Sequence, residues 1–408
     1  MGFLSDRSKY AYNPIEEEDR VAEQLAKKGA RILQLNRGDP ARYFPTPRYI
    51  IDAYVEALKE EKTTYSRAEG LLQLADAVSK RYKRMYGLSI GPDDIIATEG
   101  VSEALSFLNS ALINPGESAV LFKPYYPQYI PTLTIEGGKP ILEDYDERSN
   151  WNVHTESLES SLRSLKSSGR IRRVKYMMIT NPNNPTGTVL DRKVLEQIVG
   201  LARDYGLMLI SDEIYDEIIF SHARFTSVCE VARGQPYVIL NGASKDLDST
   251  GFRIGFAIIP GNDKKSKQLK QTLDNYALVR LSVNTPAQWA ITEAINNTKE
   301  HRKHITMMVA EIERRAGFVM KRLAENPYFT TVKPHGAFYV FPRIDLKQLR
   351  FRNDNEFVDR LLREKDVQVV RGSAFGSPSH FRIVPLPPKE ILGTAIDRIN
   401  EFCRKNAK

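Results

Sequence analysis

The chain has 408 residues, of which 41% are hydrophobic and 27% are charged, and its formal net charge is +8. This length predicts two domains, because a single hydrophobic core rarely grows beyond about 250–300 residues. The apolar runs are short and none reaches the roughly 20 residues that cross a bilayer, so we expect no membrane partner. Residues 1–18 are charged and lack the apolar segment of a secretory signal.

Cysteine and histidine usage argues against a metal centre. The two cysteines, Cys229 and Cys403, form no Cys-x-x-Cys pair, which predicts no disulfide framework and favours a reducing cytoplasm. Among the six histidines, His301 and His304 stand in a highly charged stretch that predicts a solvated helix surface. Basic residues are interspersed with acids, so we expect no nucleic-acid partner, although some of the positive charge can serve anionic ligands.

The predicted elements begin with a helix over 15–29 and a short strand over 32–35. Helical patterns, clearest over 190–205, then alternate with seven apolar runs that we predict as strands: Ile95–Thr98, Ala119–Phe122, Lys139–Leu142, Val174–Thr180, Leu207–Ser211, Tyr237–Leu240 and Ile254–Ile259. Several runs are continuously apolar, which is typical of strands buried on both faces. The alternation predicts an α/β domain in which helices cover a mainly parallel, seven-stranded sheet.

The pattern changes near residue 284. A long helical stretch over 286–325 is followed by a strand pattern over 330–342. The chain then continues with a helix over 355–365, short strands over 367–370 and 381–384, and a last helix from residue 388. These elements predict a smaller α+β domain that packs with the N-terminal segment. The predicted domains are therefore 46–285 (large) and 1–45 with 286–408 (small).

Ligands of such sheets bind beyond the carboxyl ends of the strands, so polar residues that follow apolar runs are candidates for the site. Lys245 ends the string NGASK just after one run. Burial disfavours its ammonium form and so favours the free amine that imine chemistry needs. Arg253 follows in the string GFRIG, where a guanidinium suits a phosphate. The alternative is a surface loop with ordinary basic residues.

Asp212 follows another run, in the string SDEIY. A carboxylate among apolar residues needs a cationic partner, and a protonated pyridine nitrogen is one such partner. That proton makes the ring an electron sink, as the chemistry of pyridoxal 5'-phosphate requires. The alternative is a helix N-cap aspartate.

Asn184 stands in the string NPNNPTG over 181–187, in which prolines and a glycine fix the turn. The turn could hold the side chain of one of its three asparagines in place, and an asparagine amide can donate a hydrogen bond to a phenolate oxygen. A plain turn is the alternative for a shorter fragment.

Gly100, Val101 and Ser102 follow the first predicted strand and open a helix. Unpaired N–H groups at a helix N-terminus form a ready phosphate site. A simple N-cap explains the same residues equally well.

Taken together, these strings resemble the class I/II aminotransferases of fold type I over about residues 31–386. Four further strings resemble the alanine (glutamate–pyruvate) branch: NRGDP from Asn36, RLSVNTPAQ from Arg280, VKPHGAFYVFPRID from Val332 and RGSAFG from Arg371. The resemblance implies a three-layer αβα large domain, the cofactor pyridoxal 5'-phosphate and a homodimer with shared active sites. It also implies ping-pong exchange of amino groups between amino acids, alanine favoured, and 2-oxoglutarate.

The resemblance also assigns roles to individual residues. It implies that Lys245 carries the cofactor and moves the α-proton, and that Asp212 faces the ring nitrogen. Tyr215 and Asn184 are implied to donate to the ring hydroxyl oxygen, while Tyr126 stacks on the ring. The remaining implied contacts comprise phosphate ligands (Val101, Ser102, Arg253 and the partner's Tyr65) and substrate ligands (Arg382 for the α-carboxylate, Gly38 through its backbone, Tyr12).

The sequence departs from the family pattern at two places. Gly242 replaces the serine or threonine that often contacts the phosphate three residues before the lysine. The substrate-side Tyr-x-x-Arg of the alanine branch is also incomplete, because Tyr12 is followed by no arginine at the required spacing. Arg280 is a candidate to bind the distal carboxylate of a dicarboxylic substrate, with a structural ion pair as the alternative.

The sequence motifs are compatible with other functions. Within the same class, an aspartate or a broad, aromatic aminotransferase is the near alternative. A C–S lyase would share the cofactor half of the site. A transcription regulator with an aminotransferase-like domain is disfavoured, because about 30 residues before Ile32 are too few for a DNA-binding module.

Overall fold

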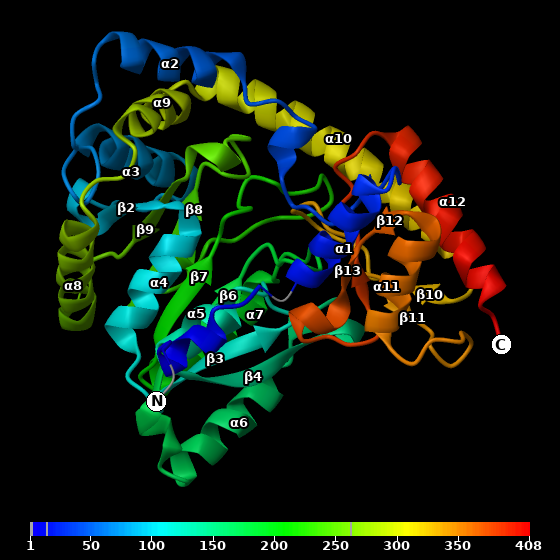
Figure 1. The fold of residues 1–408 in the computed structure, drawn as a ribbon. Coiled ribbons are helices and arrows are strands. Elements are labelled where there is room, and N and C mark those ends of the chain that lie inside the picture. The colour runs from blue at the N-terminus through cyan, green and yellow to red at the C-terminus, as the bar shows by residue number, and fades with distance from the viewer. Residues whose placement is uncertain (1–2, 14, 262) are drawn as a thin grey trace.

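The computed structural model describes residues 3–13, 15–261 and 263–408 of the chain. Its centre is an eight-stranded mixed sheet with the order β2–β9–β8–β7–β6–β3–β4–β5 (Figure 1). These strands are β2 (Ile95–Glu99), β3 (Ser118–Lys123), β4 (Lys139–Asp146), β5 (Asn152–Val153), β6 (Val174–Thr180), β7 (Met208–Asp212), β8 (Tyr237–Gly242) and β9 (Ile254–Ile258). All seven predicted strands are present. The sheet has one more, β5, a two-residue edge strand that is too short to show any hydrophobic alternation.

The direction of the strands brings several loops to one edge of the sheet. The strands β8, β7, β6, β3 and β4 pair in parallel, whereas β9 is antiparallel to both β2 and β8. Since β2 and β8 both oppose β9, they point the same way. The carboxyl ends of β2, β3, β6, β7 and β8 therefore meet at the same edge.

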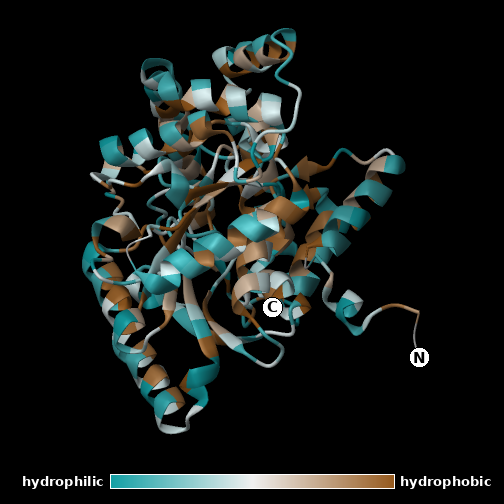
Figure 2. Ribbon diagram, turned by 90° about the vertical axis from the view of Figure 1, so that its left-hand side faces the viewer, coloured by the Kyte–Doolittle hydropathy of each residue, from teal (hydrophilic) through white to brown (hydrophobic). Residues whose placement is uncertain are grey.

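Helices cover both faces of the sheet, which makes the predicted αβα sandwich. One core contains apolar residues of α4 (Gly100–Leu112), α5 (Tyr129–Ile135) and α8 (Lys264–Arg280). The other contains those of α2 (Arg48–Lys59), α3 (Leu72–Tyr86), α6 (Thr155–Ser167), α7 (Arg192–Asp204) and α9 (Thr285–Asn296). Neighbouring strand residues alternate between the cores, as Ile210 and Leu209 do, because side chains of a strand point to opposite faces. Figure 2 shows helices that mix polar and apolar residues around a largely apolar sheet.

A third core lies beside the sandwich and joins both ends of the chain. It is built mainly from α10 (Thr298–Ala324), α11 (Asp354–Lys365) and α12 (Lys389–Lys405). The short strands here are β1 (Leu33–Gln34), β10 (Phe329–Thr330), β11 (Arg343–Ile344), β12 (Val367–Gln368), β13 (Val370–Arg371) and β14 (Phe381–Arg382). Because β1 pairs in parallel with β12, the N-terminal helix α1 (Glu16–Lys27) lies among the C-terminal elements, as predicted (Figure 1).

Two predictions for the C-terminal half were wrong in detail. The helical stretch over 286–325 is divided into α9 and α10 at Asn297, whose side chain accepts a hydrogen bond from the Glu300 amide and caps α10. The strand pattern over 330–342 forms only β10 and isolated bridges, since Ala337 has a φ of 52°, in the left-handed region that interrupts a strand.

The change of core does not coincide with the predicted boundary at residue 285. Helix α9 packs in the core of the large sandwich through Ala287, Ala290, Ile291 and Ala294. The next helix, α10, contributes to the third core from Ile305 onward. The division into two domains stays a prediction, with Asn297 as the point at which the core changes. Among the described residues, no helix is both long and apolar enough to span a bilayer.

Candidate active site

A cavity of about 460 Å³ lies at the carboxyl edge of the sheet, between the sandwich and the C-terminal elements. Ten of the thirteen predicted site residues line it: Gly38, Val101, Ser102, Tyr126, Asn184, Asp212, Tyr215, Lys245, Arg253 and Arg382. The strand register explains part of this convergence, since Thr180 of β6 lies beside Asp212 of β7, which lies beside Leu240 of β8. Residues that follow these strands are therefore neighbours.

Lys245 extends from the loop after β8 into the cavity. Its Nζ donates a hydrogen bond of 2.7 Å to the backbone oxygen of Gly38. Burial lowers the pKa of Lys245 to about 8, with Asp39 acting in the opposite direction. At pH 7 roughly one-tenth of this amine is therefore uncharged, far more than for an ordinary lysine, and the uncharged form is the nucleophile.

Asp212 ends β7 and is 4% exposed. Its carboxylate accepts a hydrogen bond of 2.5 Å from the hydroxyl of Tyr129 and a longer one from the Ile214 amide. Burial raises the pKa of Asp212 to about 6, and these hydrogen bonds only partly offset the effect. The carboxylate is suited to a cation placed in the cavity, because that cation would restore its ionised form.

Arg382 of β14 is fixed by two hydrogen bonds deep in the cavity. One nitrogen donates 2.9 Å to Oδ1 of Asn184, and another donates 2.6 Å to the backbone oxygen of Asn36. The buried Nε of Arg382 has no partner among the described residues, and burial lowers the pKa of the guanidinium. A guanidinium held in this way suits a carboxylate ligand.

Arg253 lies at the N-terminal end of α4, where Val101 and Ser102 also face the cavity. Its guanidinium donates to the backbone oxygens of Glu99 and Thr250. Gly100 has a φ of 72°, and a Cβ at this position would collide with the Arg253 guanidinium, so only glycine fits. The first turn of α4 has no side-chain cap. The arrangement combines a cation with free helix N–H groups, which is a suitable site for a phosphate.

Tyr215 forms a contact that the sequence did not predict. Its hydroxyl lies 2.6 Å from that of Tyr339, and both rings are buried. The Tyr339 ring also lies 4.8 Å from the Arg382 guanidinium. A Cβ on Gly38 would lie 2.7 Å from the Tyr339 hydroxyl, so the glycine leaves room for this tyrosine. Tyr339 lines the cavity, although within GAFYVF it looks like any strand residue.

The glycine at position 242 has a steric explanation. A Cβ on Gly242 would lie 2.7 Å from the Cα of Gly255 on the antiparallel neighbour β9. Real Cβ contacts this short are essentially absent, and the obstacle is backbone. The serine or threonine expected there from the family pattern therefore does not fit this backbone.

Three predicted site residues do not line the cavity of their own chain. Tyr65 is 80% exposed, and its contact with a neighbouring subunit stays a prediction. Tyr12 lies in a separate depression with Tyr125, and Pro14 of the same segment is outside the described residues. Arg280 donates 3.2 Å to Glu103 and also to the backbone oxygens of Ala68 and Ala97. These contacts favour the structural alternative for Arg280.

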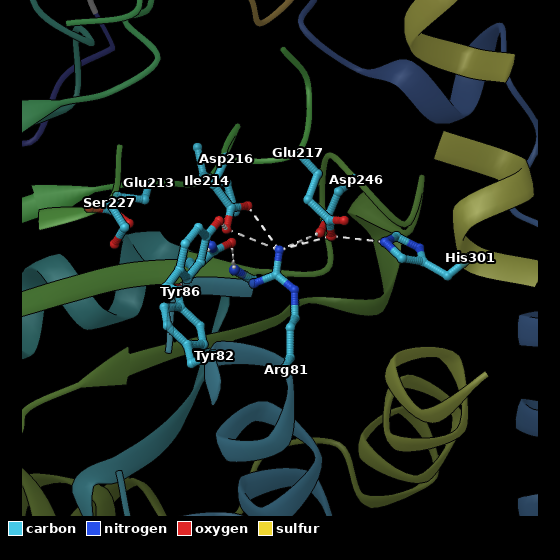
Figure 3. A network of polar contacts seen from close by, with 12 residues as sticks. Arg81, Tyr82, Tyr86, Glu213, Ile214, Asp216, Glu217, Ser227, Asp246 and His301 are labelled. Carbon is cyan, nitrogen blue, oxygen red and sulfur yellow. Dashed lines mark hydrogen bonds and ion pairs between the residues drawn. The ribbon is translucent and has the colours of Figure 1, made fainter. Parts of the chain in front are cut away.

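A buried ionic network, which was not predicted, surrounds Arg81 of α3 (Figure 3). One nitrogen of Arg81 donates to three acids, with N···O distances of 2.9 Å to Asp216, 2.9 Å to Glu217 and 3.2 Å to Asp246. His301 lies 2.8 Å from Glu217, so its predicted place on a solvated surface is wrong. His304 likewise contacts Asp248 at 2.8 Å. The sequence gives no local signal for this network, because Arg81 is more than 130 residues from each acid.

The acids of this network resemble a metal site only in part. The ligand atoms of Glu217, Asp246 and His301 lie within 4.8 Å of one another. The Arg81 guanidinium already contacts both carboxylates, however, and supplies the cation that buried acids need. The network is best described as an anchor for the segments that carry Tyr215 and Lys245.

Comparisons with known proteins agree with this geometry. The model of the family "Aminotransferase class I and II" matches residues 30–399. The chain is 33% identical to the glutamate-pyruvate aminotransferase AlaA of Haemophilus influenzae, over 94% of this chain and 93% of that protein. It is 32% identical to the aspartate aminotransferase of Thermotoga maritima, with 95% of each chain covered. The solved alanine aminotransferase from Pyrococcus furiosus superposes with a TM-score of 0.93 at 34% identity, covering 99% of this chain and all of that one.

Proposed function

Because the chain belongs to the class I and II aminotransferase family, we propose that it moves the amino group of an L-amino acid, alanine favoured, to 2-oxoglutarate. Pyridoxal 5'-phosphate is its proposed cofactor. The observation that carries this proposal is the single cavity in which a buried amine, a buried carboxylate and two guanidinium groups converge, contributed by Lys245, Asp212, Arg253 and Arg382.

The residues present fit this cofactor. Gly100 leaves space at the N-terminus of α4 for the phosphate, with Arg253, Val101 and Ser102 around it. Asp212 is a buried carboxylate whose pKa is raised by burial, as expected where a pyridinium cation has its place. Lys245 would hold the aldehyde carbon and Asn184 the ring hydroxyl oxygen. When bound, the cofactor withdraws electrons from the substrate α-carbon.

The chain's own residues then have distinct tasks. Arg382 binds the substrate α-carboxylate, because its guanidinium is fixed by Asn184 and by the backbone of Asn36. The Lys245 amine takes the proton from the α-carbon and holds it for return, which a pKa of about 8 permits near neutral pH. Asp212 stabilises the proton on the ring nitrogen. Burial of all three groups strengthens these interactions.

Both substrates would use the same cavity in turn, since it contains one α-carboxylate clamp. This favours ping-pong kinetics, in which the first oxo acid leaves before the second one binds. Alanine is favoured by the similarity to alanine aminotransferases. The aspartate aminotransferase of Thermotoga maritima is similarly related, so aspartate is the competing substrate.

A homodimer is the proposed assembly, with Tyr65 of each chain reaching the partner's phosphate site. Exposed apolar side chains near the end of α8 support such an interface, since Leu278, Val279 and Leu281 are 59%, 85% and 52% exposed. The cytoplasm is the proposed compartment, in agreement with two unpaired cysteines.

The proposal is tested by loading the purified chain with pyridoxal 5'-phosphate and reducing it with borohydride. We expect the label on Lys245 alone and no label in Lys245→Ala. A panel of amino donors and 2-oxo acids then ranks the substrates, and alanine with 2-oxoglutarate should be among the best pairs. Ammonia release from cysteine-type substrates without an oxo acid would instead indicate a C–S lyase, and a protein that never takes up the cofactor would refute the proposal.

A further inference from the structure

Four cationic residues line the active-site cavity, Arg37, Lys245, Arg253 and Arg382, and of these Arg37 and Arg253 are exposed. Under the proposed function, Lys245 holds the cofactor, Arg253 its phosphate and Arg382 the substrate α-carboxylate. Arg37 is left without a task. Over residues 3–13, 15–261 and 263–408, its guanidinium has no hydrogen-bond or ion-pair partner. A cation that faces a ligand cavity and has no internal partner is available to an anionic part of the ligand.

The backbone around Arg37 fixes where this cation stands. The oxygen of Asn36 accepts from Arg382, and the oxygen of Gly38 accepts from Lys245. Arg37 therefore lies between the backbone contacts of Arg382, the proposed α-carboxylate ligand, and of Lys245, which is proposed to take the α-proton. A substrate held at both points has its α-carbon beside this segment. Arg37, Asn13 and Ile15 line the same cavity and so border the space available to the side chain of such a substrate.

Two acidic residues lie in this part of the cavity, so a substrate with a second carboxylate needs a cation there. Asp19 and Asp39 both line the cavity. Asp19 accepts hydrogen bonds from Asn36 and Gln368, and Asp39 accepts one from Thr250. Within the described part of the chain, neither acid forms a salt bridge to Arg37. A second carboxylate placed near these acids without a cation would be repelled.

The structure points against the other candidates for this task. Arg280 donates to Glu103 and to two backbone oxygens and does not line the cavity. Tyr12 carries no positive charge and lines another depression. We infer that Arg37 binds the distal carboxylate of dicarboxylic substrates such as glutamate, 2-oxoglutarate and aspartate. This inference rests on the proposed function and names the residue that selects its dicarboxylic partner.

The test compares Arg37→Gln and Arg37→Lys with the wild type, all as cofactor-loaded enzyme. Calorimetry with succinate and butyrate isolates the distal group, because the two ligands differ only in a carboxylate that replaces a methyl. We expect Arg37→Gln to weaken the binding of succinate at least about tenfold more than the binding of butyrate, because a charge-assisted hydrogen bond to the distal carboxylate is lost. Arg37→Lys should lose less, because it keeps the charge without the planar fork.

Kinetics give the second readout, the ratio of kcat/KM for dicarboxylic and neutral substrates. This ratio should fall about tenfold or more in Arg37→Gln. The matched control is Arg42→Gln, since Arg42 is on the same segment, bonds to Gln34 and does not line the cavity. Its ratio should equal that of the wild type.

The inference is overturned if Arg37→Gln weakens the binding of succinate and butyrate equally or leaves both affinities unchanged. It is also overturned if Arg280→Gln lowers the substrate ratio and Arg37→Gln does not. Either result would leave the proposed function intact, provided that the wild type takes up the cofactor and exchanges amino groups. Failure of the wild type to do so would refute the proposed function itself.

Discussion

The hydroxyl groups of Tyr215 and Tyr339 lie 2.6 Å apart, with both rings buried beside the active-site cavity. If Tyr339 donates to Tyr215, the Tyr215 hydroxyl is left to donate into the cavity, where the ring oxygen of the cofactor is proposed to lie. The hydrogen bond thus aligns one tyrosine through another. Tyr339 also stacks near Arg382 and so touches the substrate side of the same cavity.

Replacing Tyr339 with phenylalanine should lower kcat by about 3- to 10-fold, because one buried hydrogen bond contributes about 1 kcal/mol. The variant should also shift the pH dependence of the visible absorbance of the bound cofactor, since Tyr215 would no longer be aligned. Tyr176→Phe is the matched control, as its buried hydroxyl donates 2.6 Å to Asn109 outside the cavity. An unchanged absorbance profile in Tyr339→Phe would contradict the alignment role.

Uptake of the cofactor by the empty chain should depend on pH. The pKa of Lys245 is lowered to about 8 by burial, and only the uncharged amine attacks an aldehyde. The rate should therefore rise with pH and level off above about pH 8, after a roughly tenfold increase per pH unit well below that value. Stopped-flow absorbance measures this rate. A midpoint near the ordinary lysine pKa would show that burial does not act on this amine.

Asp212→Asn should separate stability from function. Burial raises the pKa of Asp212 from 3.8 to about 6, so its contribution to stability is complete below pH 3.8 and is lost as the pH rises through 6. At pH 7.5 the ionised Asp212 costs the empty chain up to about 3 kcal/mol. The empty variant should thus have a higher Tm than the empty wild type at pH 7.5, and the difference should vanish near pH 4.

The order of the two Tm values should reverse when the cofactor is bound. The variant lacks the charge that is proposed to face the ring nitrogen, so it should bind the cofactor less tightly and lose about 100-fold or more in kcat. Differential scanning calorimetry and steady-state assays measure the two effects. The exposed Asp93→Asn serves as control and should change neither. A lower Tm of the empty variant at pH 7.5 would refute the assigned burial cost.

Arg81→Met should destabilise the fold by about 3–5 kcal/mol, because three acids would remain buried without their cation. Arg84→Met on the same helix is exposed and should stay within about 0.5 kcal/mol of the wild type. Denaturant unfolding of the empty chains gives both values. A loss of less than about 1 kcal/mol in Arg81→Met would show that the acids are neutralised in some other way.

The sequence predicted the large sandwich well, because buried parallel strands appear as continuous apolar runs. It also predicted ten residues that line one cavity, since polar strings directly after such runs fall at the same edge of the sheet. The strand pattern over 330–342 failed because a left-handed Ala337 breaks a sequence that otherwise alternates like a strand. No local sequence pattern predicts a left-handed conformation at an alanine.

The residues that the sequence missed share a different cause. Tyr339 and Arg81 act through partners more than 120 residues away, and their own neighbourhoods look ordinary. Arg37 belongs to the string NRGDP, which resembles the family pattern as a whole and gives no separate signal for the arginine. Both kinds of residue become visible when the spatial neighbours of the cavity are known.

The Arg81 network has a consequence for how the protein fails on heating. Asp216 directly follows Tyr215 in the chain, and Asp246 directly follows Lys245. One guanidinium from α3 therefore restrains the backbone next to two proposed cofactor ligands, which arrive from β7 and β8. Once that restraint opens, both ligands are released together. Loss of the visible absorbance of the bound cofactor and loss of the native fold should therefore occur as one event during thermal inactivation.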